Sequence, residues 1–262
     1  MVLAMMISTQ CNFHCGHCMV NSSHDYNFMD DNVLEKCYHL IETNNPDWVY
    51  LIGGEPFLHI EKIELIVRNI KKYCTNILIF TNGSFLMNDK LKKRVDVLNV
   101  SIRISNDRFH REMWSKELEK RIFSSGYRIE TVADEEDMIP VGRAFEEFKH
   151  LQYNMGCSLI SGRYGRSYPN GHRYMVMMNG DVNLYCSTVE AALANVFEDE
   201  NITYELLVKR ERILHNYLYQ HIIRCEEDTY MAKMCNECPK YKVNNMYILY
   251  ESKILAECAD YE

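Results

Sequence analysis

Three cysteines stand within eight residues near the start of the sequence, in the stretch CNFHCGHC at residues 11–18. Thiolates bind borderline and soft metals, so Cys11, Cys15 and Cys18 are candidate metal ligands. A structural zinc ion takes four protein ligands, and a [4Fe–4S] cluster takes four thiolates, one for each iron. Three cysteines on one loop leave one iron without a protein ligand. The amino and carboxylate groups of a small molecule can chelate that iron.

The composition narrows the class of protein. The chain has 262 residues, 47% of them apolar, and a formal net charge of −8. That balance argues against nucleic acid as the main partner. The apolar start, MVLAMMIS, is too short for a membrane span and lacks the basic region and cleavage site of a signal peptide. We therefore expect a cytoplasmic protein without a membrane partner, in which eleven cysteines are not explained by disulfides.

The elements that position these residues alternate between strands and helices. Apolar runs predict buried strands, and apolar residues at helical spacing predict amphipathic helices. The predicted strands cover 2–8, 48–52, 76–80, 98–104 and 127–133, and helices cover 30–44 and the stretch from Ile63 to Cys74. Repeated strand–helix units predict an α/β fold with a parallel sheet. The polar and glycine-rich motifs follow the strand ends, which is the edge where such sheets bind ligands.

The pattern changes after about residue 150. Two short apolar runs around Asn179-Gly180, within 173–186, predict a β-hairpin. An amphipathic helix is expected over 202–225, followed by Cys235 and Cys238 in CNEC. We therefore predict a first domain at 1–150 and a smaller one at 151–262.

Four motifs follow predicted strands in order, and together they resemble the radical S-adenosylmethionine (SAM) enzymes. They are CNFHCGHC at 11–18, GGEP at 53–56, TNG at 81–83 and SNDRFH at 105–110. PVGRA at 140–144 resembles a further motif that follows the later strands of that family. A four-cysteine zinc protein with chance glycines is the alternative to this interpretation.

The resemblance implies a partial (β/α)6 TIM-like barrel of parallel strands, a [4Fe–4S] cluster on the three cysteines, and SAM. It also implies that the cluster delivers one electron to SAM, producing a 5′-deoxyadenosyl radical that abstracts hydrogen from a substrate. The residue before the third cysteine is commonly aromatic in the family. It is His17 here, and its imidazole can still lie against adenine. The implied SAM contacts are His17, Gly53, Gly54, Glu55, Asn82, Ser105 and Asp107.

A second cysteine set resembles the SPASM domain or its shortened form, the twitch, which ends many of these enzymes. The chain offers NGDVNLYC, LANVFED and CNEC in the expected order. The resemblance implies an auxiliary [4Fe–4S] cluster in a C-terminal extension built from a β-hairpin and a helix, and zinc is the alternative occupant. The implied ligands are Cys157, Cys186, Cys235 and Cys238, with Cys225 or Cys258 as alternatives to Cys157.

The remaining candidates carry no assigned chemistry. Cys37 and Cys74 are expected to be buried apolar residues on helix faces. His14, His24 and His110 lack metal-ligand spacing with another histidine, so no catalytic base is assigned.

Two substrate classes fit a radical SAM enzyme with such an ending. Modification of a ribosomally made peptide ranks first, and oxidation or rearrangement of a small sugar, cyclitol or nucleotide is the alternative. Because the chain begins directly at the first predicted strand, we expect any peptide-recognition domain to be a separate protein. The expected electron donor is a flavodoxin or a ferredoxin. A non-catalytic iron–sulfur redox sensor is a third, weaker hypothesis, because it gives no use to GGEP or SNDRFH.

Overall fold

The computed structural model describes residues 1–130, 143, 173–184 and 192–211. Strands and helices alternate through the first 130 residues, as the sequence predicts. The strands are β1 (Val2–Ser8), β2 (Trp48–Gly53), β3 (Ile77–Thr81), β4 (Ser101–Ser105), β5 (Arg128–Glu130), β6 (Arg173–Val176), β7 (Asp181–Leu184) and β8 (Ala194–Asn195). The helices are α1 (Asp31–Asn44), α2 (Ile60–Ile70), α3 (Asp89–Val97), α4 (Arg108–Arg111) and α5 (Lys116–Ser124), with 3₁₀ turns η1 (Pro56–His59) and η2 (Ser84–Met87).

All of these strands belong to one sheet with the order β5-β4-β3-β2-β1-β6-β7-β8. Every pairing from β5 across to β6 is parallel, and β7 and β8 continue the sheet by antiparallel pairing. The predicted α/β class with parallel strands is therefore confirmed. Parallel strands bring their carboxyl ends to the same edge of the sheet, so the loops after β1, β2, β3 and β4 meet there.

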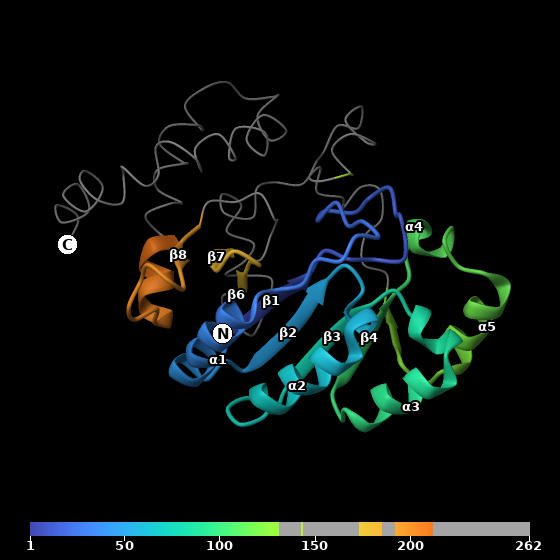
Figure 1. The fold of residues 1–262 in the computed structure, drawn as a ribbon, viewed down its shortest axis with the longest axis horizontal. Coiled ribbons are helices and arrows are strands. Elements are labelled where there is room, and N and C mark those ends of the chain that lie inside the picture. Colours follow the sequence, from blue (N-terminus) through green and yellow to red (C-terminus); the bar gives the residue numbers. More distant parts are fainter. Residues whose placement is uncertain (131–142, 144–172, 185–191, 212–262) are drawn as a thin grey trace, which may run out of the picture.

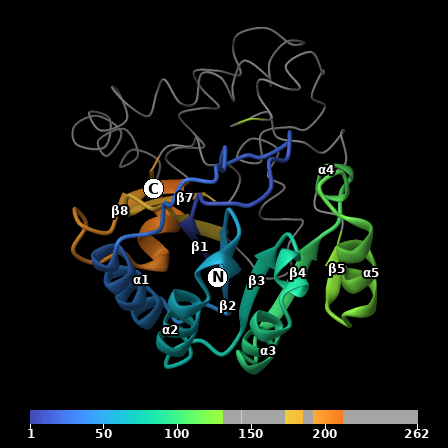
Figure 2. The same cartoon turned by 45° about the vertical axis from the view of Figure 1, so that its right-hand side comes forward.

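Helices α1, α2 and α3 lie along one face of the sheet (Figures 1 and 2). Leu3, Met5 and Ile7 of β1 belong to the large apolar core shared with these helices. Ala4 and Met6 point the other way, into a second, smaller cluster with methionines of the C-terminal half. Because β1 is buried on both faces, its sequence is continuously apolar rather than alternating.

The start of β4 differs from the prediction. The expected strand began at 98, but the structure starts it at Ser101. Leu98 instead closes the end of α3, and Asn99 has a left-handed backbone with φ of 49°. Asn tolerates that conformation, and the chain can extend only after this turn.

The C-terminal half confirms the predicted hairpin. β6 and β7 pair around Asn179-Gly180, and β6 also pairs in parallel with β1. Residues 204–211 are helical, which agrees with the start of the helix expected over 202–225, and the rest of it lies outside the described residues. The end of the strand expected at 127–133 lies outside them too. The boundary at residue 150 stays a prediction.

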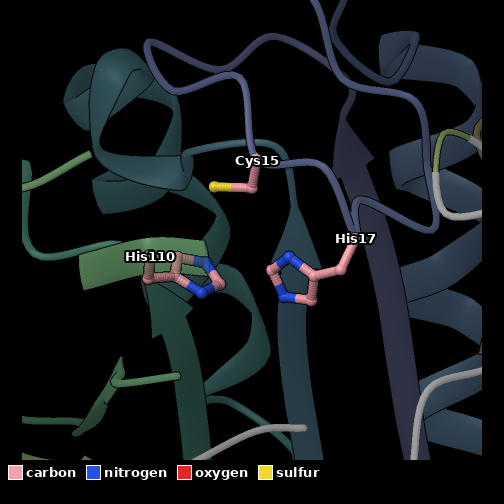
Figure 3. Close-up of side chains that lie close together, drawn as sticks. All are labelled: Cys15, His17 and His110. Atoms are coloured by element: carbon pink, nitrogen blue, oxygen red, sulfur yellow. The ribbon is translucent and has the colours of Figure 1, made fainter. Parts of the chain in front are cut away.

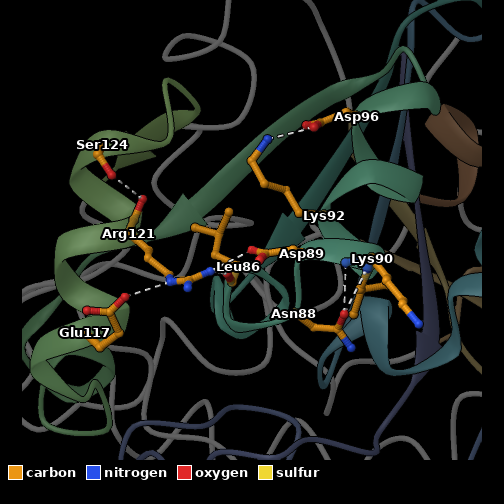
Figure 4. A network of polar contacts seen from close by, with 10 residues as sticks. Leu86, Asn88, Asp89, Lys90, Lys92, Asp96, Glu117, Arg121 and Ser124 are labelled. Atoms are coloured by element: carbon orange, nitrogen blue, oxygen red, sulfur yellow. Dashed lines mark hydrogen bonds and ion pairs between the residues drawn. The ribbon is translucent and has the colours of Figure 1, made fainter.

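The outer layer is joined by polar contacts around Arg121 of α5 (Figure 4). Its guanidinium donates to the Leu86 carbonyl oxygen at 2.9 Å and to Asp89 at 2.8 Å, and it also bonds Glu117 one turn earlier. These contacts tie α5 to η2 and α3. Exposed ion pairs of this kind each add little stability.

None of the helices in the described part of the chain combines the length and the apolar composition that crossing a bilayer requires.

Candidate functional site: a cysteine loop at the carboxyl edge of the sheet

The cysteine loop, residues 9–29, leaves β1 and folds back along its own backbone. Met29 N–H donates to the Ile7 carbonyl at 2.7 Å, and Cys11 N–H donates to the Ser23 carbonyl at 2.7 Å. The loop lies over the strand ends and next to α4 (Figures 1 and 2). The chain therefore returns across the site before α1 begins.

Two glycines at the end of β2 bring their backbone against the start of this loop. Gly54 N–H donates to the Ser8 carbonyl at 2.8 Å, and Glu55 N–H donates to the Gln10 carbonyl at 2.7 Å. A Cβ on Gly54 would lie 2.0 Å from the Gln10 oxygen, and one on Gly53 would lie 2.3 Å from the Ser8 oxygen. Only glycine permits such an approach, so Gly53 and Gly54 hold the cysteine loop at the sheet edge.

The three thiols fit a metal cluster by their chemistry and their surroundings. Cys11 and Cys15 are buried, and Cys18 is half-buried. Backbone N–H groups of Phe13 and Ser22 already point at the sulfurs of Cys11 and Cys18, at 3.4 and 3.3 Å. Hydrogen bonds to sulfur are one of the features by which a protein tunes an iron–sulfur cluster.

Burial keeps Cys11 and Cys15 protonated in the metal-free protein. It raises the pKa of Cys11 to about 11 and that of Cys15 to about 12, and the nearby carboxylates of Glu55 and Asp107 respectively add to these shifts. Metals bind the thiolate, so binding here releases protons into solvent.

Glu55, predicted as a SAM contact, is only 1% exposed and turns both carboxylate oxygens toward the end of β3. It accepts hydrogen bonds from Thr81 Oγ1 at 2.8 and 2.9 Å and from Asn82 N–H at 2.8 Å. The side-chain amide of Asn82 in turn donates to Cys11 Sγ at 3.7 Å and to Asn12 Oδ1 at 2.9 Å. Glu55 thus links β2, β3 and the cysteine loop. Burial raises the pKa of Glu55 to about 7, despite these hydrogen bonds.

Asp107, the other predicted acidic contact, holds two histidines. Its side chain is fully buried, caps α4 through His110 N–H, and bonds His110 Nδ1 at 2.6 Å. The same oxygen lies 3.4 Å from His17 Nε2. Burial alone would raise the pKa of Asp107, but the hydrogen bonds from His110 and His17 hold it below its usual range. The His17 ring stacks on Phe109 with centroids 4.6 Å apart.

Arg143, from the PVGRA motif, contacts the cysteine loop from far along the chain. Its guanidinium donates to the Cys15 carbonyl at 2.8 Å and to the Ser22 carbonyl, and its N–H donates to the Cys18 carbonyl at 2.9 Å. Sequence reasoning quoted this motif but gave the arginine no task.

The structure gathers most of the predicted site residues at one edge of the sheet. Cys11, Cys15, Cys18 and His17 lie on the cysteine loop, and the ends of β2, β3 and β4 supply Gly53, Gly54, Glu55, Asn82, Ser105 and Asp107. Cys157, Cys186, Cys225, Cys235, Cys238 and Cys258 lie outside the described residues. Cys37 is buried on α1 as predicted, whereas Cys74 is buried four residues past the end of α2.

Sequence reasoning missed His110. Metal-ligand spacing along the sequence does not indicate this residue, because its partner His17 is distant in sequence. In the fold the two rings meet with centroids 5.0 Å apart. The fold thus defines an α/β protein with a group of buried thiols, imidazoles and carboxylates at the carboxyl edge of its parallel strands.

Residues 5–124 match the family model described as the radical SAM superfamily. That segment is therefore a radical SAM domain, and the resemblance drawn from the motifs is confirmed there. The family implies a [4Fe–4S] cluster and SAM. The chain is also 26% identical to the uncharacterized protein MJ0907 of Methanocaldococcus jannaschii over 109 residues, which are 40% of this chain and 38% of that relative's length.

Three solved structures resemble this chain, and anSMEcpe among them shares its fold at a TM-score above 0.5. anSMEcpe with bound AdoMet and the Kp18Cys peptide is 14% identical, with 88% of this chain and 87% of that chain covered, at a TM-score of 0.53. BtrN in complex with AdoMet and 2-DOIA is 16% identical, with 91% and 87% covered, at a TM-score of 0.48. Streptococcus suis SuiB bound to the precursor peptide SuiA is 14% identical, with 97% and 73% covered, at 0.43.

Proposed function

We propose that Cys11, Cys15 and Cys18 hold a [4Fe–4S] cluster that leaves one iron for SAM, and that the chain is a radical SAM enzyme. The observation that carries this proposal is the position of the three thiols, which the Gly53-Gly54 backbone holds at the ligand-binding edge of the sheet. When bound, the cluster and SAM supply reductive cleavage of SAM to a 5′-deoxyadenosyl radical, which can abstract hydrogen from an unactivated C–H bond.

The chain's own residues position these groups. Asn82 and the backbone N–H groups of Phe13 and Ser22 donate to the cysteine sulfurs. Glu55 fixes Asn82, and Asp107 fixes His17, so both carboxylates act first by holding a neighbour in place. The proposed contacts of SAM remain the full predicted set: His17, Gly53, Gly54, Glu55, Asn82, Ser105 and Asp107.

We propose a ribosomally made peptide as the substrate, with a small sugar, cyclitol or nucleotide as the alternative. The peptide bound to anSMEcpe, which shares this fold, supports the first choice. A separate peptide-recognition protein and a flavodoxin or ferredoxin donor complete the proposed set of partners, in the cytoplasm. The sharpest comparison is turnover of a short precursor peptide against a set of sugars and nucleotides.

We further propose a second domain at 151–262 with an auxiliary [4Fe–4S] cluster on Cys157, Cys186, Cys235 and Cys238. Four thiolates would leave no iron open, so this cluster would serve electron transfer or structure rather than SAM binding. Zinc is the alternative occupant of this site.

Iron content tests both cluster sites in the full chain. Anaerobically reconstituted protein should hold about eight irons per chain, and Cys11, Cys15 and Cys18 changed together to Ala should leave about four. Cys235→Ala with Cys238→Ala should remove the other four. Cys74→Ser is the matched control, because Cys74 is buried away from the loop, and it should retain all the iron. Full iron in the triple variant would overturn the first site, and full iron in the double variant would overturn the second.

A further inference from the structure

Cys15, His17 and His110 lie together although the first two come from the cysteine loop and His110 comes from α4 (Figure 3). One ligand atom from each residue, a sulfur and two ring nitrogens, lies within 4.8 Å of the other two. In a tetrahedral zinc site with bonds of about 2.0–2.3 Å, neighbouring ligand atoms are about 3.5 Å apart. Side-chain movements of about 1 Å would therefore bring these three atoms into bonding range.

Asp107 prepares both imidazoles for a metal. It bonds His110 through Nδ1 and His17 through Nε2, which leaves the opposite nitrogen of each ring to act as a ligand. His17 is 8% exposed, and its Nδ1 has no hydrogen-bond partner within the described part of the chain. A carboxylate that orients a histidine through its second nitrogen is the usual outer partner of a metal-bound imidazole.

We propose that Cys15, His17 and His110 form a binding site for a single divalent cation of the zinc class, which is filled only when the cluster is absent. One thiol and two imidazoles are a donor set that Zn²⁺ favours. The Cys15 thiolate and the Asp107 carboxylate together balance the double positive charge. His110 keeps 17% of its side chain exposed, which gives the ion a side from which to enter.

The site and the cluster compete, because both use Cys15. A bound Zn²⁺ ion occupies this thiolate and blocks cluster assembly on the loop. The inference does not require SAM cleavage, since it concerns the cluster-free protein.

The test uses iron-free full-length protein carrying Cys235→Ala and Cys238→Ala, which removes the proposed second metal site. This protein is titrated anaerobically with Co²⁺ as a spectroscopic probe and with Zn²⁺ in competition. We expect one metal per chain on this loop, with the visible bands of a tetrahedral ion and the charge-transfer absorption of a single thiolate. His110→Gln should weaken binding by about 100-fold or more, and Asp107→Asn by about 10- to 100-fold. His39→Gln, an exposed histidine on α1, should leave binding unchanged.

A second variant separates this site from a site made by all three cysteines. Cys11→Ser with Cys18→Ser removes two of the three proposed cluster ligands but should retain the Co²⁺ site and its spectrum. Saturation with Zn²⁺ should also slow iron incorporation into the wild-type loop. Absorption that reports three thiolates, undiminished binding in His110→Gln, or loss of binding in the double serine variant with an intact fold would each overturn the proposal.

Discussion

The cysteine loop after β1 and the turn between β6 and β7 follow two neighbouring parallel strands, yet they are held in place differently. The turn is closed mainly by its own residues: Gly180 N–H donates to the Met177 carbonyl, and Asn179 and Asp181 bond each other. The cysteine loop instead takes contacts from the ends of β2 and β3 and from Arg143. Among the described residues, the turn takes further hydrogen bonds only from the adjoining segment at β8, where Val196 N–H donates to the Gly180 carbonyl and Asn195 donates to Asp181. The cysteine loop is thus held by several separate parts of the fold, whereas the turn is held by itself and one neighbouring segment.

This difference shows how the chain places reactive groups. Irregular loops carry function when a rigid sheet positions them. Here each neighbouring element adds one constraint: a glycine backbone, a buried carboxylate or a distant guanidinium. Perturbing these constraints should disturb the metal site, whereas perturbing the turn should affect stability alone.

The largest contrast is expected between two glycine substitutions. Gly54→Ala places a Cβ 2.0 Å from a backbone oxygen of the cysteine loop and should cost about 3 kcal/mol or more, with loss of iron from the loop. Gly180→Ala meets the Val196 side chain at 2.9 Å and has a positive φ of 88°, so it should cost about 1–3 kcal/mol. Urea unfolding and iron analysis measure both effects.

Gly126→Ala is the control for backbone strain, because Gly126 has a positive φ and its Cβ would meet nothing within 4 Å. It should cost about 1 kcal/mol and retain all the iron. Equal iron loss in the Gly54 and Gly180 variants would contradict the claim that only the cysteine loop depends on its contacts with the ends of the strands.

The next effect is a pH dependence of stability from Glu55. Its pKa is about 7 when folded against 4.5 ordinarily, so between these values the folded protein retains a proton that the unfolded chain loses. The contribution of Glu55 to the free energy of unfolding is fully present below about pH 4.5. It falls by about 3 kcal/mol as the pH rises to 7 and beyond.

Glu55→Gln carries no charge and should remove this slope, although the amide loses an acceptor for Thr81 or Asn82. Unfolding free energies of iron-free protein across this pH range measure it. If the unfolding free energy of Glu55→Gln falls with pH as steeply as that of the wild type, ionisation of Glu55 does not destabilise the fold.

A smaller effect is expected from Arg143. Arg143→Ala removes two charge-assisted hydrogen bonds to carbonyl oxygens of the cysteine loop and should cost about 2 kcal/mol, with faster amide exchange across residues 11–23. Arg143→Lys should not restore the slow amide exchange, because an ammonium group cannot reproduce the planar guanidinium that donates to two carbonyl oxygens.

Arg121→Ala is the matched control, because Arg121 also donates to a backbone carbonyl but on the outer layer. It should leave exchange in residues 11–23 unchanged. If amide exchange across residues 11–23 is equal in the Arg143 and Arg121 variants, Arg143 does not stabilise the cysteine loop.

The sequence predicted the local features well and the long-range ones only in outline. The buried strand at 2–8, the helix after Asp30 and the Asn179-Gly180 hairpin follow from periodicity, capping and turn chemistry, and the structure confirms them. The motifs placed the cysteine loop, Glu55 and Asp107 at one edge, because parallel strands end there. The partners of those carboxylates were not predicted, since Glu55 is far in sequence from Thr81 and Asn82, and Asp107 is far in sequence from His17.

Release of 5′-deoxyadenosine tests the central claim most directly. Reconstituted full-length protein, given SAM and dithionite without substrate, should release 5′-deoxyadenosine and methionine slowly, because the three cysteines leave one iron for SAM. The variant with Cys11, Cys15 and Cys18 changed to Ala should release none, and Cys74→Ser should match the wild type. Wild-type protein with a full, reducible cluster that releases no 5′-deoxyadenosine would contradict the account.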